Sequence, residues 1–141
     1  MTPPKNIESS AKVLVFACID PRYTATLEKH LIDEKELHGD YDLFALAGCE
    51  LGCIKKSAWK RTFFEHVDLA VALHGISDIW CYSHLDCGAY KAFLELEKDN
   101  DPKVHTKELR KFKKICAKKY PDLKFRGYLM NLEGGIKLMV K

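Results

Sequence analysis

With 141 residues, of which 47% are hydrophobic and 30% charged, the chain has the length and composition of one soluble globular domain. Its 23 basic and 20 acidic side chains leave a formal charge of +3, too small to indicate a polyanionic partner. No apolar run approaches the roughly 20 residues of a membrane span, and the N-terminus lacks the apolar stretch of a signal peptide. We therefore expect a single cytoplasmic domain over residues 1–141, with no membrane or nucleic-acid partner.

The first half of the chain alternates apolar runs, typical of buried strands, with helical periodicity. In chain order we predict a strand over residues 13–18, a helix over 23–38, a strand over 43–47, a loop over 48–53 and a helix over 57–74. Gly39 and Gly75 are expected to end the two helices, and Ser57 is expected to cap the second.

The second half continues the alternation. It predicts a strand over residues 78–83, a helix over 88–97, a loop over 99–102, a basic amphipathic helix over 103–119, a strand over 124–132 and a turn over 133–135. The basic helix could contact nucleic acid, but its charges spread around one face, so a solvated face is the better interpretation. Alternating strands and helices predict an α/β fold, with a mostly parallel sheet of about four strands flanked by helices.

Candidate metal ligands lie where the predicted strands end. Cys18 ends the first strand, His84 directly follows the third, and Cys87 lies three residues further on. Ligands of parallel sheets bind beyond the carboxyl ends of the strands, and two thiolates with one imidazole suit zinc. Asp20 can reach the same place, and Arg22 can pair with it. Each motif alone also arises by chance, so the residues by themselves leave a metal site and a coincidence about equally open.

Taken together, these motifs resemble those of the β-class carbonic anhydrases. C-x-D-x-R at residues 18–22 and H-x-x-C-G at 84–88 match the zinc motifs of that family. Residues 42–48 resemble its second strand and R-N-A-G loop, and residues 69–92 resemble its helix, strand, zinc turn and next helix. The resemblance covers roughly residues 12–95 and 123–138.

The resemblance implies a role for each matched residue. Cys18, His84 and Cys87 would bind Zn²⁺, with water or Asp20 in the fourth position. A zinc-bound hydroxide would attack CO2 and give bicarbonate reversibly, the lyase reaction of carbonic anhydrases. Asp20 would accept a hydrogen bond from that hydroxide, and Arg22 would hold Asp20 in place. Family members pair along a sheet edge, so a homodimer or a higher homo-oligomer is expected.

The chain also departs from the family pattern. Ala45 and Leu46 stand where the family has arginine and asparagine, and the chain has no glutamine to orient a substrate. We also expect the chain to lack the long N-terminal helical arm with which family members clasp a partner subunit. Two alternatives therefore stay open: a related zinc hydrolase of COS or CS2, or a non-catalytic zinc-stabilised domain that binds a partner or senses redox state through Cys49 and Cys53.

Further residues near the motifs have simpler interpretations. Cys49 is expected near the pocket mouth, in the loop after the second strand, and Cys49 and Cys53 are interpreted as two ordinary loop thiols or as a redox pair. Tyr82 and Tyr90 flank the zinc turn, where packing is the expected role. The histidines other than His84 are expected at the surface or the edge of the core.

Overall fold

The computed structural model describes residues 8–141, which form one sheet of five strands. The strands are β1 (Val13–Ala17), β2 (Tyr41–Ala45), β3 (Asp78–His84), β4 (Lys124–Met130) and β5 (Ile136–Val140). Their order is β2-β1-β3-β4-β5; the first four are parallel, and β5 is antiparallel to β4. The mostly parallel α/β sheet predicted from the sequence is confirmed, with one strand more than the expected four.

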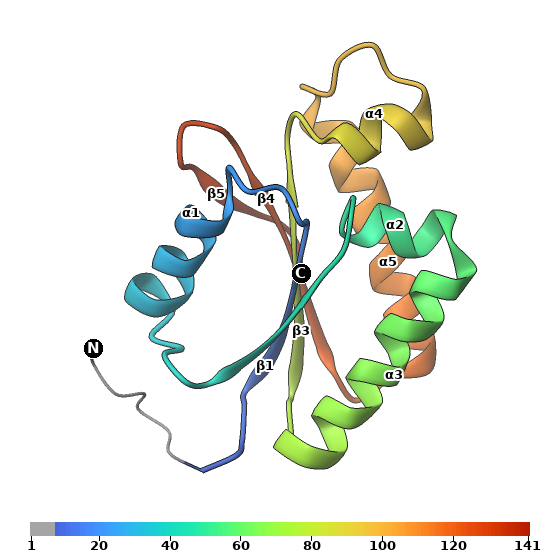
Figure 1. The fold of residues 1–141 in the computed structure, drawn as a ribbon. Helices are drawn as coiled ribbons and strands as arrows, with labels where there is room; N and C mark the ends of the chain where they lie inside the picture. The colour runs from blue at the N-terminus through green and yellow to red at the C-terminus, as the bar shows by residue number, and fades with distance from the viewer. Residues whose placement is uncertain (1–7) are drawn as a thin grey trace.

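Helices cover both faces of this sheet (Figure 1). They are α1 (Thr24–Lys29), the π-helical turn η1 (His30–Glu34), α2 (Glu50–Lys55), α3 (Ser57–His74), α4 (Gly88–Leu94) and α5 (Pro102–Lys119). The α1–η1 segment packs on one face, and α2, α3 and α5 pack on the other. Among residues 8–141, every helix is too short or too polar to cross a lipid bilayer.

Alternate side chains of β1 enter two separate cores. Leu14 and Phe16 join the core beneath α3 and α5, where Phe16 stacks on Phe63 with 4.5 Å between ring centroids. Val13 and Val15 join the core beneath α1 and η1. Because the side chains of a strand alternate between its faces, a β1 that is apolar throughout must be covered on both. This central placement brings the carboxyl end of β1 beside that of β3.

Several predicted boundaries of the N-terminal half were wrong. The helix predicted over 23–38 ends at Glu34, because η1 widens its last turn and the backbone N–H of Lys35 bonds His30. The strand predicted over 43–47 begins at Tyr41, which pairs in register with Val13 of β1. Ser57 is the first residue of α3 and does not cap it; Lys56 holds the cap position, while Gly75 ends the helix as expected with φ 66°.

Three more differences lie around the later elements. The loop predicted over 48–53 contains the start of α2, whose residues 50–53 are buried. The helix predicted over 88–97 ends at Leu94, where Glu95 takes a left-handed conformation with φ 53°. After the predicted turn, the chain returns as β5, which the sequence analysis missed. The expected lack of a signal peptide and of a helical arm concerns the N-terminus, whose residues 1–7 lie outside the described part.

Candidate metal centre

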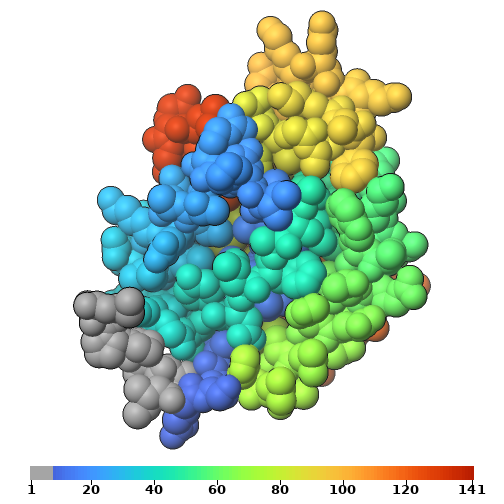
Figure 2. Space-filling view, viewed as in Figure 1, coloured from blue at the N-terminus to red at the C-terminus, as the bar shows by residue number. Residues whose placement is uncertain are grey.

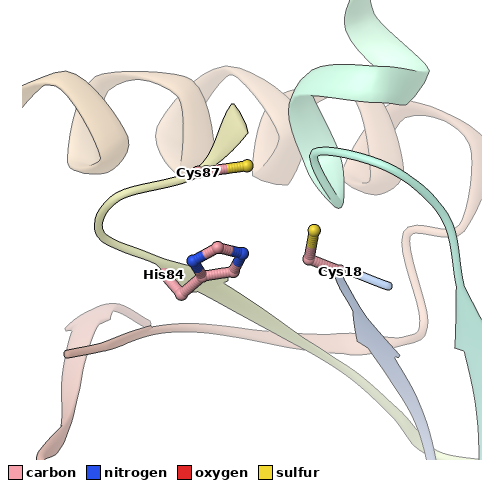
Figure 3. Close-up of side chains that lie close together, drawn as sticks. All are labelled: Cys18, His84 and Cys87. Atoms are coloured by element: carbon pink, nitrogen blue, oxygen red, sulfur yellow. The ribbon is translucent and has the colours of Figure 1, made fainter. Parts of the chain in front are cut away.

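Three predicted ligands come together where β1 and β3 end. Cys18 directly follows β1, His84 is the last residue of β3, and Cys87 precedes the first residue of α4. Their side chains point toward one another (Figure 3). One nitrogen and two sulfur donor atoms all lie within 4.8 Å of one another. The parallel pairing of β1 with β3 is what brings residues 66 positions apart (84 − 18) into one cluster.

The imidazole of His84 is held in one orientation by its neighbours. His84 is buried, and its Nδ1 donates to the carbonyl oxygen of Leu85 at 2.7 Å. Tyr23 stacks on the ring with 4.1 Å between centroids, and its hydroxyl donates to the same carbonyl. Nε2 therefore carries a free lone pair, yet it is buried and has no hydrogen-bond partner. A buried acceptor without a partner is costly in a folded protein, and a metal ion among these donors would satisfy it.

The two thiols hold different charges. A hydrogen bond from Cys87 lowers the pKa of Cys18 to about 4, against the opposing effect of burial. The backbone N–H of Gly48 also donates to the Cys18 sulfur at 3.4 Å. The hydrogen bond to Cys18 and burial raise the pKa of Cys87. The pair therefore carries one negative charge and one proton that a cation could displace, because metals bind thiolates.

Asp20 and Arg22 form the predicted ion pair beside this cluster. Arg22 donates to both carboxylate oxygens of Asp20, through Nε to Oδ1 at 3.1 Å and through Nη2 to Oδ2 at 2.8 Å. These bonds lower the pKa of Asp20 to about 2, so its carboxyl group is ionised at neutral pH. Asp20 Oδ2 lies 3.9 Å from His84 Nε2. The carboxylate therefore borders the cluster while Arg22 fixes its orientation.

Arg22 also holds the turn between the candidate ligands His84 and Cys87. It donates to the Asp86 carboxylate at 2.9 Å and to the Asp86 carbonyl oxygen at 2.8 Å, and Lys91 binds the same carboxylate at 3.1 Å. Asp86 has φ 56°, a left-handed backbone conformation that residues other than glycine rarely adopt. The sequence analysis did not single out Asp86, although its place between His84 and Cys87 was a usable signal.

A buried polar cluster lies beneath this turn, and the sequence analysis missed it. Asp99 accepts hydrogen bonds from the backbone N–H of Cys87 and from His105, and His105 bonds Ser83. Beside them, the hydroxyl of Tyr90 donates to the carboxylate of Glu50, and both of these residues are buried. His105 is fully buried, so its expected place at the surface or the edge of the core was wrong.

Other expectations around the site have clear outcomes. Cys49 does not lie at a pocket mouth as expected; it is buried, as is Cys53, and burial raises the pKa of each thiol. Tyr82 and Tyr90 are packed in the interior, as expected. His30 is buried as well, with its Nε2 3.0 Å from the hydroxyl of Tyr82.

The surface around the cluster is formed by segments from three parts of the chain. In the space-filling view, the segments after β1 (blue), after β2 (teal) and around α4 (yellow) meet on one face (Figure 2). A cavity of about 180 Å³ adjoins Cys18. Aliphatic side chains, including Leu27, Leu31 and Leu43, make up most of its lining together with Ala45. Thr24, Glu28 and Tyr41 complete the lining, and the cavity meets the cluster at Cys18. A small, weakly polar molecule would suit its aliphatic part.

Comparison with known proteins gives relatives in sequence and in fold. An uncharacterized protein of Rickettsia bellii is 32% identical over 135 residues, covering 92% of this chain and 82% of that protein. An uncharacterized protein of Rickettsia conorii is 30% identical over 135 residues, covering 92% of this chain and 72% of that protein. No model of a known protein family matches the chain.

Solved structures with the same fold are carbonic anhydrases. The enzyme from Streptococcus mutans has a TM-score of 0.62 at 17% identity, covering 95% of this chain and 86% of that chain. A tetrameric β-carbonic anhydrase from Sordaria macrospora has a TM-score of 0.63 at 15% identity, covering 94% and 81%. A β-carbonic anhydrase from Trichomonas vaginalis has a TM-score of 0.65 at 12% identity, covering 100% and 88%. At these identities the likeness concerns the fold.

Proposed function

The chain belongs to the same family as the two rickettsial proteins and has the β-carbonic anhydrase fold, and from this premise we propose that it is a zinc-dependent enzyme that hydrates CO2 reversibly to bicarbonate. The observation that carries the proposal is the buried, unpartnered Nε2 of His84 beside two cysteine sulfurs and an arginine-held carboxylate. A merely packed histidine would not need that carboxylate.

Cys18, His84 and Cys87 would hold the zinc ion. A Cys2His donor set leaves a fourth position open, as in catalytic zinc sites. When bound, zinc supplies a water molecule whose pKa is lowered to about 7, which makes a nucleophile available at neutral pH. Arg22 holds the Asp20 carboxylate through two side-chain hydrogen bonds, which favours its role as a neighbour of the cluster over a role as fourth ligand.

Asp20 would orient the attacking water, whose proton would leave to solvent. Its carboxylate is ionised at neutral pH because Arg22 lowers its pKa, so it can only accept a hydrogen bond. Accepting one bond from the water would aim the oxygen lone pair at the carbon of CO2. Arg22 keeps the carboxylate in that orientation and is itself fixed by Asp86.

The cavity beside Cys18 would admit the substrate. Its mainly aliphatic lining and its volume of about 180 Å³ suit a small, linear, weakly polar molecule such as CO2. Ala45 lines this cavity at the position where the resemblance places an arginine, so the entry is more apolar than the family pattern implies. COS and CS2 share this shape and polarity, which keeps a zinc hydrolase of those substrates as the second candidate.

A redox-sensing role for Cys49 and Cys53 has less support. Both thiols are buried and have raised pKa values, whereas redox-sensing cysteines are exposed and readily ionised. The hypothesis of a non-catalytic zinc domain therefore has less support than either enzyme hypothesis.

We further propose that two copies of the chain pair along the edge formed by β2. Leu43 of β2 and Leu69 and Leu73 of α3 are more than half exposed and line one groove of about 210 Å³. These leucines form an apolar patch beside an edge strand that has unpaired backbone groups, and a second copy of the chain can cover both. The tetrameric state of the Sordaria macrospora enzyme supports an assembly of this kind.

Stopped-flow measurement of CO2 hydration, with zinc content determined on the same sample, tests the proposed reaction. We expect the zinc-loaded wild type to hydrate CO2, and Asp20→Ala to retain zinc while losing about a hundredfold or more in kcat/KM. Asp122→Ala serves as the control, because Asp122 is exposed at the opposite end of the sheet, just before β4. Zinc-loaded wild type with only background hydration would exclude the CO2 reaction, and the same assay with COS and CS2 would decide the second candidate.

A further inference from the structure

We propose that Asp99 is a positioning residue for Cys87 and that His105 and Ser83 fix Asp99 in turn. The inference rests on the proposed zinc site and adds residues that none of the recognised motifs contains. Asp99 lies between α4 and α5, 12 positions beyond Cys87 (99 − 87), and it is 3% exposed. A buried carboxylate in a connecting segment requires specific partners, and the partners of Asp99 lead directly to the zinc turn.

Asp99 binds two consecutive backbone N–H groups of that turn. Its Oδ2 accepts from the N–H of Cys87 at 2.9 Å, and its backbone oxygen accepts from the N–H of Asp86 at 2.7 Å. Asp86 is the residue with the left-handed backbone, and such conformations persist only where the surroundings hold them. Asp99 therefore fixes the two peptide groups that flank the Cα atom of Asp86, and with them the direction of the Cys87 side chain.

His105 holds the other side of the Asp99 carboxylate. Its Nε2 lies 2.7 Å from Oδ1 and 2.9 Å from Oδ2, and its Nδ1 lies 2.7 Å from the hydroxyl of Ser83. The ring of Tyr90 stacks on the imidazole with 3.8 Å between centroids. An ionised Asp99 requires a proton on Nε2, so that Nδ1 accepts from Ser83. Each donor then has an acceptor, and β3, α4 and α5 are tied to the turn.

The Ser83–His105–Asp99 chain is not a hydrolytic triad. All three residues are at most 3% exposed, so no substrate can reach the Ser83 hydroxyl. One carboxylate oxygen of Asp99 also accepts a hydrogen bond from the backbone N–H of Cys87. The chain instead has the arrangement by which outer hydrogen bonds orient the ligands of a metal, where loss of one partner typically weakens metal binding about 10- to 100-fold.

The test compares zinc affinity and the optical spectrum of the cobalt-substituted protein in matched variants. Asp99→Ala removes the acceptor for Cys87. Asp99→Asn retains an acceptor and needs only a change of His105 tautomer. Tyr90→Phe is the control, because it removes the buried bond to Glu50 and keeps the ring on His105 without touching the turn. Zinc affinity is measured by competition with a chelator, and the sulfur-to-cobalt charge-transfer bands report on the bonds to Cys18 and Cys87.

We expect Asp99→Ala to bind zinc about 10- to 100-fold more weakly, with altered cobalt bands. Asp99→Asn should stay close to the wild type, and Tyr90→Phe should lose stability without losing zinc affinity. Wild-type affinity and bands in Asp99→Ala would overturn the inference, and so would an equal loss of affinity in Tyr90→Phe, because affinity would then merely follow stability.

If Asp99→Ala does not fold, His105→Phe takes its place, since it preserves the stacked ring and removes the support of Asp99. Weaker zinc binding by that variant supports the inference, and unchanged binding overturns it. A wild type that binds no zinc would instead overturn the proposed metal site and this inference with it, so the two failures are distinguishable.

Discussion

Among single residues, Glu50 carries a carboxyl group that is fully removed from solvent. Burial raises its pKa above the ordinary value of 4.5, and the hydrogen bond from Tyr90 only partly opposes this effect. Because the folded-state pKa lies above the unfolded one, the folded protein retains a proton that the unfolded chain releases. The contribution of Glu50 to stability is therefore complete below about pH 4.5 and declines as the pH rises.

Glu50→Gln should remove this dependence. We expect the variant to unfold at a higher temperature than the wild type at pH 8, with the difference shrinking as the pH falls toward 4.5. Thermal unfolding followed by circular dichroism across that range measures it. Glu133→Gln, at an exposed position, is the control and should show no such trend. If the difference in unfolding temperature between Glu50→Gln and the wild type did not change with pH, Glu50 would ionise in the folded protein as it does in water.

Residue type and spacing were enough to predict the cluster of candidate ligands but not the residues that support it. Cys18, His84 and Cys87 follow predicted strand ends, and the topology of a parallel sheet brings such ends together. Asp99 and His105 had no comparable signal, because aspartate in a loop and histidine on a helix are common in any chain. Only the packing of α5 against the sheet brings His105 next to Asp99 and Ser83.

At the scale of elements, continuous apolar runs predicted the central strands well, and weaker signals gave the errors. β1 and β3 are buried along their whole length, which the sequence expresses directly. β2 lies at the edge of the sheet and begins with two half-buried residues, so the apolar run in the sequence starts later than the strand does. α2 was predicted as a loop because a six-residue helix with a glycine inside has little intrinsic stability, and its packing against α3 supplies the rest.

Gly52 is the residue that lets α2 pack so closely. A Cβ atom at this position would meet the Leu46 side chain, lie 2.5 Å from the carbonyl oxygen of Ala47 and lie 3.0 Å from the Trp59 ring. Gly52→Ala must therefore displace backbone, and we expect it to lower the free energy of unfolding by about 1–3 kcal/mol. Urea unfolding measures this loss.

Gly88→Ala is the matched control for Gly52→Ala, because a Cβ at Gly88 meets no atom within 4 Å. It should leave the stability of the zinc-free protein nearly unchanged. If Gly52→Ala and Gly88→Ala unfolded at the same urea concentration as the wild type, the close approach of α2 would not matter to the fold.

For the whole molecule, the β2 edge determines the expected assembly. Leu73 of α3 is 65% exposed and lines the groove beside β2, so replacing it leaves the interior of one subunit intact while placing a charge on the proposed contact. We expect the wild type to be a dimer or a larger assembly by light scattering, and Leu73→Lys to be a monomer that still binds zinc. Leu132→Lys, at a position 54% exposed beyond β4, should assemble like the wild type. A wild type that remains monomeric at high concentration would remove the proposed interface.

The zinc site of two thiolates and one imidazole is the central claim, and X-ray absorption at the zinc edge of the purified protein tests it most directly. We predict one zinc ion per chain with two sulfur neighbours at about 2.3 Å and lighter neighbours, including one imidazole nitrogen, at about 2.0–2.1 Å. In Cys87→Ser the metal should be lost or retain a single sulfur neighbour. A wild type without zinc, or with zinc that has no sulfur neighbours, would contradict the site formed by Cys18, His84 and Cys87.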